Sequence, residues 1–409
     1  MAALLQGVRV LDLSRVFAGP FATQMLADFG ADVIKIERPG QGDESRGQGT
    51  PLQAGDDGDA PPGFSSAFLA MNRGKRSVTV DISTDAGQDI VRSLALQCDV
   101  LVENYKVGDL ARYRLDYDSL HTLNPRLVYC SVTGFGQTGP RAQEPGYDLV
   151  FQAMSGVMSV TGVPDGQPGA GPQRVGYSVS DITAAHHAVI AILGALYARE
   201  AGHAGGQHID VALLDTQIAA ASHVAMGYLM SGRAPEPIGA ASQFMAPYQP
   251  FDCADGALVI LCGNDGQFRR LCGVLGLPAL ADDARFATNF ARLRFRDELL
   301  ARLQPVIASR TRAHWTALLK PAAVPNAPLY DFAEAFEDPQ VKARGLRLEM
   351  PLTDGRPVPM VANPLRFSET PVAYERPPPA LGEHTAEVCA GLLGISPARL
   401  RQLRASGVL

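Results

Sequence analysis

In the N-terminal third of the chain, short apolar runs alternate with amphipathic stretches. Residues 7–13 (GVRVLDL) and 31–37 (ADVIKIE) predict strands, and residues 20–29 between them predict a helix with a proline in its first turn. Further strands are predicted at residues 77–82, 99–103 and 127–132, and an amphipathic helix at 85–97. This alternation predicts an α/β fold in which helices cover a parallel sheet.

After residue 180 the pattern changes to longer helical segments. Helices are predicted at residues 181–200 and 211–230, separated by the turn AGHAGG. Residues 246–262 predict a hairpin, and residues 267–319 predict several helices. Nearer the N-terminus, residues 41–63 are rich in Gly, Asp, Gln and Pro and predict an exposed loop.

The chain length predicts two domains. A single hydrophobic core rarely serves more than about 250–300 residues, and this chain has 409. We expect a large domain at the start of the chain, a helical linker, a smaller domain, and a return linker whose C-terminal part packs on the large domain. The expected boundaries are residues 1–200, 201–230, 231–325 and 326–409.

Charge and hydropathy narrow the classes of ligand. With 46% hydrophobic and 19% charged residues the composition is that of a globular protein. The net charge of -6 provides no overall basic field for nucleic acid or anionic membranes. The chain shows neither a basic start with a long apolar run nor an apolar stretch of the roughly 20 residues that span a bilayer. We therefore expect a cytoplasmic protein that binds neither nucleic acid nor membranes.

Cysteine and histidine usage gives no sign of a metal. The six cysteines form no Cys-x-x-Cys pair, which is typical of buried thiols in a reducing compartment. The histidines are scattered, and the adjacent His186 and His187 project about 100° apart on a helix. Because no ligand spacing is present, no metal site is predicted.

One stretch, residues 134–139, has the G-x-G-x-x-G spacing of a dinucleotide-binding loop. That fingerprint needs a helix that opens at the third glycine to receive the pyrophosphate, whereas Pro140 and a polar run follow here. The first predicted strand-to-helix turn, residues 18–20, also lacks the glycine pattern. A nicotinamide or flavin site is not predicted, and residues 176–180 (GYSVS) miss the nucleophile elbow of serine hydrolases.

Asp181 lies between an alternating, strand-like run (Val175, Tyr177, Val179) and a helix with an apolar face. An acidic residue at a helix start commonly caps free backbone amides and needs no other role, and the local sequence favours that interpretation. Alternatively, the helix dipole keeps the carboxylate ionised at neutral pH, as a nucleophile requires.

Several cations lie near the expected carboxyl edge of the sheet, where parallel sheets present their ligands. Taken singly, each is a solvated loop cation. Together they could bind a multiply phosphorylated ligand, and they are Arg38, Lys75, Arg76, Lys106 and Arg112.

Five segments in the same order give the chain a close resemblance to a known family. They are VLDLSRVFAGPFATQMLADFGADVIKIERPG (10–40), NRGKRSVTVD (72–81), DVLVENYKVGDLARY (99–113), PGYDLVFQAMSGVMSVTG (145–162) and the residues around Ser178-Val-Ser-Asp181. The chain resembles the class III CoA-transferases, which include formyl-CoA transferase and the carnitine CoA-transferases. The resemblance implies a large Rossmann-like domain, a smaller α+β domain and an interlocked homodimer whose crossing linkers lie near residues 200–230 and 325–345.

The resemblance also implies the reaction. Asp181 would attack the thioester of a donor acyl-CoA, and CoA would then return to the aspartate to give an aspartyl-CoA thioester. An acceptor carboxylate would repeat these steps in reverse, with coenzyme A as the carried group and without ATP or metal.

Site residues follow from the same resemblance, position by position. The CoA site would comprise Phe17, Ala18, Arg38, Asn104, Tyr105, Lys106 and Arg112. Tyr147 would lie near the acyl group, and residues 80–83 near the nucleotide, although Ser83 replaces the lysine of formyl-CoA transferase. Gly263, Asn264 and Asp265 match the start of a glycine-containing loop of the small domain that covers the active site.

Two alternatives to a transferase remain open on the sequence, as does the choice of substrate among the transferases. An α-methylacyl-CoA racemase needs a paired base and acid, with a histidine where this chain has Tyr147. A CoA-binding protein without catalysis would use Asp181 only as a cap. Within the transferases, the pattern resembles the branch that uses succinyl-CoA with dicarboxylic acids, and Arg15 could pair with the distal carboxylate.

Overall fold

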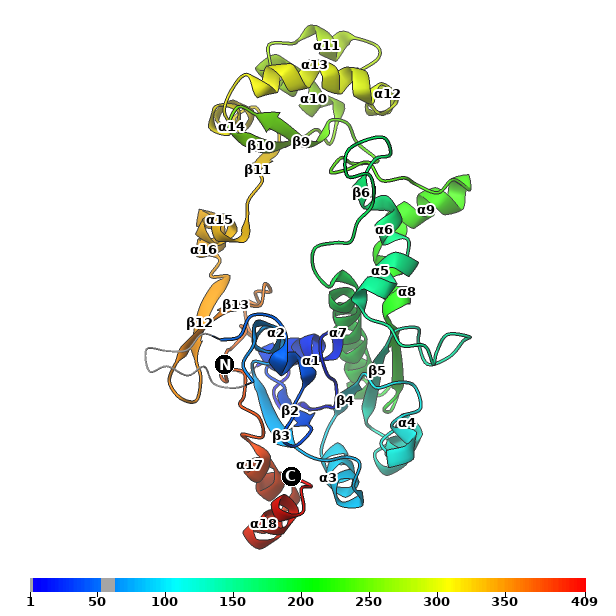
Figure 1. Ribbon diagram of the computed structural model, residues 1–409, viewed down its shortest axis with the longest axis vertical. Helices are drawn as coiled ribbons and strands as arrows, with labels where there is room; N and C mark the ends of the chain where they lie inside the picture. Colours follow the sequence, from blue (N-terminus) through cyan, green and yellow to red (C-terminus); the bar gives the residue numbers. More distant parts are fainter. Residues whose placement is uncertain (1–2, 53–62) are drawn as a thin grey trace. The chain divides into compact units, whose positions relative to one another are not determined.

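The computed structural model describes residues 3–52 and 63–409, and its backbone divides into two compact units (Figure 1). Unit 1 comprises Met1–Val157, Val175–Ser231 and Gln340–Leu409, and unit 2 comprises Met158–Arg174 and Gly232–Pro339. Residues 158–174 therefore group with the second unit although the segments on both sides of them belong to the first. The chain leaves unit 1 twice and returns twice.

Unit 1 is built on a six-stranded parallel sheet in the order β3-β2-β1-β4-β5-β8. The strands are β1 (Arg9–Asp12), β2 (Asp32–Glu37), β3 (Lys75–Thr79), β4 (Val100–Glu103), β5 (Val128–Thr133) and β8 (His208–Ala212). The alternation of strands and helices thus confirms the predicted α/β class.

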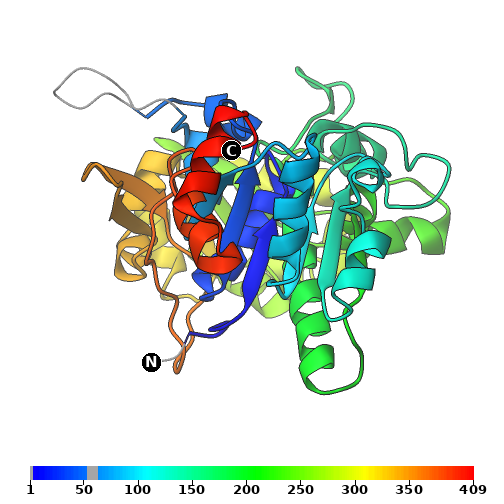
Figure 2. The ribbon, with the colours of Figure 1, turned by 90° about the horizontal axis from the view of Figure 1, so that it is seen from below.

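Helices cover both faces of this sheet because successive strand residues point to opposite sides. Val10 of β1 and Val33 of β2 pack with α1 (Ala18–Asp28) and α7 (Val179–Glu200), whereas Leu11 and Ile34 pack on the other face. That other face carries α3 (Asp85–Ala95), α4 (Tyr117–Leu123), α17 (Thr385–Leu393) and α18 (Pro397–Ala405). Figure 2 shows the C-terminal helices in red beside the blue N-terminal strands.

The edge strand β3 is covered by the C-terminal segment. The amide of Gly74 donates to the carbonyl of Arg376 at 2.9 Å, and the amide of His384 donates to the carbonyl of Ser77 at 2.9 Å. Thr79 N–H donates to the hydroxyl of Thr385 at 3.0 Å. Backbone groups that would face solvent along this edge are therefore paired within the chain.

The shorter elements of unit 1 lie in the connections and after unit 2. The helices are η1 (Glu44–Gly47), α2 (Ser66–Met71), η2 (Ala111–Tyr113), α5 (Asp148–Met154), α8 (Leu213–Ala220), α9 (Ser222–Ser231) and α16 (Pro339–Ala343). The antiparallel pair β12 (Arg347–Pro351) and β13 (Pro357–Val361) packs its buried residues against α2. The short helix α6 (Val157–Val160) begins at the last residue of the first segment of unit 1.

Unit 2 has a small antiparallel sheet and a layer of helices. Its strands are β9 (Tyr248–Cys253), β10 (Gly256–Leu261) and β11 (Asn326–Pro328), with a two-residue pair β6 (Gly162–Val163) and β7 (Gly171–Pro172). Its helices are α10 (Asp265–Val274), α11 (Ala279–Asp282), α12 (Asn289–Arg294), α13 (Arg296–Ala308), α14 (Arg312–Leu319) and α15 (Phe332–Glu337). The predicted hairpin and helices of this region are thus confirmed.

Charged residues occupy the interior of the large sheet. Asp12, Lys35 and Lys75 on three adjacent strands all have 0% exposed surface. Lys75 Nζ lies 3.0 Å from Asp12 Oδ2, and Lys35 Nζ lies 2.8 Å from Asp43 Oδ2. Burial opposes ionisation of Asp12, but the two lysines hold its pKa below the usual value. Burial lowers the pKa of Lys75 to about 8.

Several expectations about local structure were wrong. Residues 175–179 form no strand, because no neighbouring strand pairs with them within the described chain. Residues 208–212, most of which precede the helix predicted at 211–230, form β8, which pairs with β5. In the predicted loop 41–63, Ser45 and Arg46 are buried in η1, while residues 53–62 lie outside the described part.

The helix α7 differs from the expectation that no apolar stretch of the chain is long enough to span a bilayer. Its 22 residues are long and apolar enough, by length and composition, to cross a bilayer. Ala184, Ala188 and Ile192 of this helix are fully buried in the core of unit 1. Core helices of soluble proteins have the same length and composition, so one such helix is weak evidence of membrane insertion.

Candidate active site at the carboxyl edge of the sheet

The strand order reverses direction between β1 and β4, which is where open parallel sheets bind their ligands. The segment after β1 and the turn after β4 meet at this point. Asn104 accepts the backbone N–H of Arg15 at 2.8 Å and donates to its carbonyl at 2.7 Å. The guanidinium of Arg15 lies 4.8 Å from the ring centre of Tyr105. The structure thus brings together Arg15, Asn104 and Tyr105, three predicted site residues.

Phe17 and Ala18 follow in the same segment. Phe17 is the N-cap residue of α1 and is half-buried, and Ala18 is buried in the first turn. Phe21, in the same turn, places its ring 6.1 Å from the ring of His186 in α7. The first turn of α1 therefore lies beside the early turns of α7.

Exposed cations surround this edge. Arg38 directly follows β2, and Lys106 follows the turn after β4. Lys106 also lines a cavity of about 250 Å³. Arg112 lies over the ring of Tyr113 at 4.6 Å and 4.0 Å from Asp109, so its charge is only weakly paired. These three side chains are available to an anionic ligand.

Two of the cations considered from the sequence are not available. Lys75 is fully buried and donates to Asp12, Asn72 and the carbonyl of Pro20. Arg76 is 7% exposed and pairs with Asp32 at 2.5 Å. The two residues are consecutive on β3, so their side chains point to opposite faces of the sheet, and each is buried in an ion pair there. The idea that they bind a phosphorylated ligand was therefore wrong.

Residues 80–83 leave β3 at the same edge of the sheet. The hydroxyl of Ser83 donates to the carboxylate of Asp81 at 2.7 Å, and the Ser83 amide donates to the same oxygen at 2.9 Å. Ser83 therefore stabilises its own turn and offers no cation at this position.

Asp181 is the third residue of α7, whose N-cap residue is Ser178. Since α7 precedes a parallel strand, it starts on the side of the carboxyl edge. The capping role considered for Asp181 belongs to another residue. Asp148, the first residue of α5, accepts the amide of Ser180 at 2.8 Å through Oδ1. Its Oδ2 accepts from Gln152 at 2.6 Å.

The Asp181 carboxylate lacks such partners within the part of the chain that the structure describes. Burial, followed by the negative charge of Asp148, raises its pKa to about 7. Burial and the charge of Asp148 thus oppose the ionisation that the helix dipole favours. At neutral pH both its ionised and its protonated forms are populated.

Tyr147 precedes Asp148 as the N-cap residue of α5, and 78% of it is exposed. Its hydroxyl forms no hydrogen bond with the described residues, and its neighbour Asp148 is hydrogen-bonded to Ser180. The side chain of Tyr147 is therefore free to contact a ligand that reaches the start of α7.

Gly263, Asn264 and Asp265 lie in unit 2, at the start of α10. Asn264 caps that helix by accepting the amide of Gln267 at 2.9 Å, and the Gly263 amide donates to the Gln267 side chain at 2.6 Å. Asp265 lies 2.7 Å from Arg292, whose side chain is fully buried. Each of these residues thus has a local structural role within unit 2.

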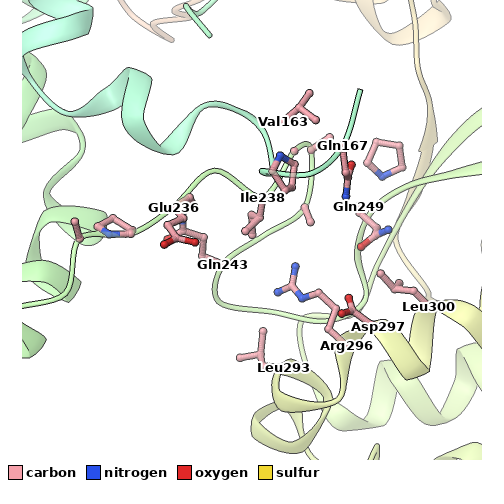
Figure 3. A pocket seen from close by; sticks show the side chains of 17 residues that line it. Val163, Gln167, Glu236, Ile238, Gln243, Gln249, Leu293, Arg296, Asp297 and Leu300 are labelled. Carbon is pink, nitrogen blue, oxygen red and sulfur yellow. Dashed lines mark hydrogen bonds between the residues drawn. The ribbon is translucent and has the colours of Figure 1, made fainter. Parts of the chain in front are cut away.

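A larger cavity, of about 890 Å³, also lies within unit 2 (Figure 3). Arg296 enters it from α13 and donates to the carbonyl of Ser242 at 2.5 Å. None of the predicted site residues lines this cavity, although Glu236, Gln243 and Asp297 do. Volume alone does not place the chemistry there, because the convergent predicted residues lie in unit 1.

Sequence reasoning missed three buried acids of unit 1. They are Asp148, which caps α7; Asp43, which pairs with Lys35; and Glu103, the last residue of β4. Glu103 accepts the amide of Tyr105 at 2.8 Å, and burial raises its pKa to about 7. The sequence did contain a signal for Glu103, because an acidic residue ends the apolar run that forms β4.

Comparison with known proteins agrees with this geometry. The sequence matches the model of CoA-transferase family III over residues 5–385. It is 48% identical, over 95% of both chains, to a succinate–glutarate CoA-transferase of Agrobacterium fabrum. It is 37% identical to the succinyl-CoA:glutarate CoA-transferase of Homo sapiens, over 99% of this chain and 90% of the human one.

A solved structure gives the same result. A CAIB/BAIF family protein from Brucella suis is 42% identical and superposes with a TM-score of 0.83, covering 96% of this chain and 100% of that one. The chain belongs to CoA-transferase family III, as its sequence segments predicted, and is a class III CoA-transferase. Among the described residues, no group of three or more His, Cys, Asp or Glu is arranged to hold a metal.

Proposed function

We propose that this enzyme moves CoA from succinyl-CoA to a dicarboxylic acid. The observation that carries the proposal is the identity of 48% with a succinate–glutarate CoA-transferase over nearly the whole of both chains. Exposed Arg38, Lys106 and Arg112 beside the strand-order reversal suit the phosphates of CoA, and Phe17, Ala18, Asn104 and Tyr105 form the adjoining segments. The substrate is thus held by cations at the rim and positioned by a rigid turn.

The proposed chemistry begins at Asp181. Its carboxylate oxygen attacks the thioester carbonyl of succinyl-CoA, the C–S bond breaks, and CoA leaves as the thiolate. The thiolate then attacks the Asp181 carbonyl, which releases succinate and forms an aspartyl-CoA thioester. The acceptor carboxylate attacks the carbonyl of this thioester, the C–S bond breaks, and the CoA thiolate leaves an anhydride between Asp181 and the acceptor acid. The returning thiolate takes the acceptor acyl group and regenerates Asp181.

The environment of Asp181 supports this role. Asp148, and not Asp181, accepts the amide at the start of α7. The carboxylate of Asp181 forms no hydrogen bond with the described residues. A carboxylate without partners is more nucleophilic than one that accepts several hydrogen bonds. Ionisation remains accessible because its pKa of about 7 lies near neutral pH.

A racemase is the weaker alternative. It would need a base and an acid on opposite sides of the α-carbon. The position of the racemase histidine is Tyr147, whose ordinary pKa of about 10 makes it a poor base at neutral pH. No observation on unit 1 favours proton abstraction over transfer.

The unpaired, buried state of all six cysteines supports a cytoplasmic location. Cell fractionation tests this location, and enzyme activity found in an oxidising compartment would contradict it.

The expectation that the protein binds neither nucleic acid nor membranes rests on its net charge and hydropathy. Sedimentation with DNA or with anionic vesicles tests this expectation.

We further propose a homodimer, supported by large apolar side chains that each of the two units leaves exposed. They include Ile190, Tyr197, Met226, Tyr228, Leu229, Met230, Leu329 and Phe332. Such apolar exposure beyond a scattered background is typical of an interface between subunits. Sedimentation equilibrium is expected to give twice the chain mass of 43.4 kDa, and a species of single-chain mass at micromolar concentration would contradict the dimer.

The covalent intermediate is the direct test of the function. Incubation with succinyl-CoA followed by borohydride or hydroxylamine is expected to change the mass of a peptide that contains Asp181. In Asp181→Asn the change should be absent and transfer should fall by about 10³-fold or more, because the nucleophile is lost. Transfer by the Asp181→Asn protein at the rate of the wild type would overturn the proposal.

The pH dependence of the first half-reaction follows from the environment of Asp181. Since its pKa is raised to about 7 and the ionised form attacks, kcat/KM for succinyl-CoA should rise with pH through about 7 and fall below it. Asp148→Asn removes a like charge, so its profile should move to lower pH. The measurement should cover about 1.5 pH units on either side of this pKa, from about pH 5.5 to about pH 8.5. If kcat/KM does not change over this range, the assignment of Asp181 as the nucleophile is contradicted.

The role of Arg15 in substrate choice is measurable. Its NH1 group is 2.7 Å from Glu44, and its remaining donors can receive a distal carboxylate. Arg15→Met is expected to raise the KM for glutarate about tenfold and to leave the KM for butyrate, which lacks the second carboxylate, within about twofold. Equal effects on the two acids would assign Arg15 to CoA binding or folding instead.

A further inference from the structure

Val16 has a backbone conformation that its residue type rarely adopts. Its φ is +66°, and it is one of three non-glycine residues with positive φ among the described residues, the others being Arg114 and Ala323. A branched Cβ makes this left-handed conformation unfavourable. Strained residues persist only where their surroundings determine them, and they gather at functional sites. Val16 lies between Arg15 and Phe17, directly before the first turn of α1.

Hydrogen bonds from two separate segments hold this residue and its neighbour. The Val16 amide donates to Asp43 Oδ1 at 3.1 Å. Asn104 holds both backbone polar groups of Arg15, at 2.8 and 2.7 Å. The turn is therefore fixed on one side by the connection after β2 and on the other by the turn after β4.

Asp43 is itself held rigidly. It is 2% exposed, and its Oδ2 lies 2.8 Å from the ammonium of Lys35, which has no exposed surface. Its amide donates to Glu37 at 3.0 Å, and its Oδ1 also accepts the amide of Ser45 at 2.8 Å. Lys35 donates in addition to the carbonyl of Ser14 at 2.9 Å, so one lysine fixes both Asp43 and the residue before Arg15.

We propose that Asp43 is a positioning residue of the transferase, which holds the strained turn at Val16 so that residues 15–18 have their CoA-binding shape before CoA arrives. The proposal rests on the proposed function, in which Phe17 and Ala18 contact CoA. A turn that is already formed loses little conformational entropy on binding, so its contribution is to affinity. The chemical step at Asp181 does not pass through Asp43.

The side chain of Asp43 forms an ion pair with Lys35 through one oxygen and accepts two backbone amides through the other. An amide presents one acceptor and one donor group, so Asp43→Asn cannot accept both from Lys35 and from the amides of Val16 and Ser45. In this variant either the Val16 amide loses its acceptor or residue 43 loses its ion pair with Lys35, and either change weakens the hold on the strained turn. Glycine at position 16 adopts positive φ without a steric penalty, so Val16→Gly removes the need for that support.

The test is a mutant cycle read by calorimetric binding of CoA and by succinyl-CoA kinetics. Asp43→Asn should weaken CoA binding about tenfold, with kcat changed by no more than about threefold. In the Val16→Gly background the same substitution should cost no more than about threefold. Ala323→Gly, which relieves positive φ in unit 2, is the matched control and should give no such rescue.

Equal costs of Asp43→Asn in both backgrounds, or equal rescue by Ala323→Gly, would overturn the proposal and leave Asp43 as a structural partner of Lys35. Hydrogen exchange of the wild type gives an answer even if Asp43→Asn does not fold. The Val16 amide should be protected to the same degree with and without CoA, and protection that appears only with CoA would overturn preformation. Failure of the proposed function is distinct, because wild-type enzyme would then bind no CoA or form no adduct at Asp181.

Discussion

The ammonium group of Lys35 fixes the carboxyl edge of the sheet, although it has no contact with solvent. It lies 2.8 Å from Asp43 and donates to the carbonyl of Ser14, so the segments after β1 and β2 share one buried charge. Buried ion pairs give little net stability, because desolvation offsets much of their attraction. Removing one partner leaves an uncompensated charge, which makes their geometry hard to change. The buried ion pair of Lys35 therefore fixes the geometry of the site but adds little to the stability of the fold.

Two carboxylates at the start of α7 have different environments and so take different tasks. Asp148 accepts hydrogen bonds from Ser180 and Gln152, and it supplies the cap of the helix. Asp181 lies one residue further along α7 than Ser180 and has the raised pKa. Neighbouring carboxylates in different environments are typical of sites in which each has a separate role. Here one carboxylate is structural and the other is left for chemistry.

The sequence predicted more of the fold than of the site. Strands β1, β2, β4 and β5 follow from apolar runs, because a buried parallel strand needs apolar residues on both faces. Strand β8 was missed, since its five residues become a strand only by pairing with β5. The interpretation of Asp181 as a cap failed because its competitor, Asp148, lies 32 residues from Ser180 and no local pattern links them. Asp43 was taken as part of a loop because composition does not show that Lys35 requires a buried partner.

The pairing of β3 with residues 376–385 makes the sheet depend on a segment that is synthesised much later. Hydrogen bonds from Gly74 to Arg376 and from His384 to Ser77 form only after residues 376–384 have been made. Until then the backbone donors and acceptors along β3 are open, and an open strand edge is a template for pairing with another chain. Nascent copies on the same messenger RNA are such chains. Residues 376–384 thus cover an edge that would otherwise be open to pairing with another chain.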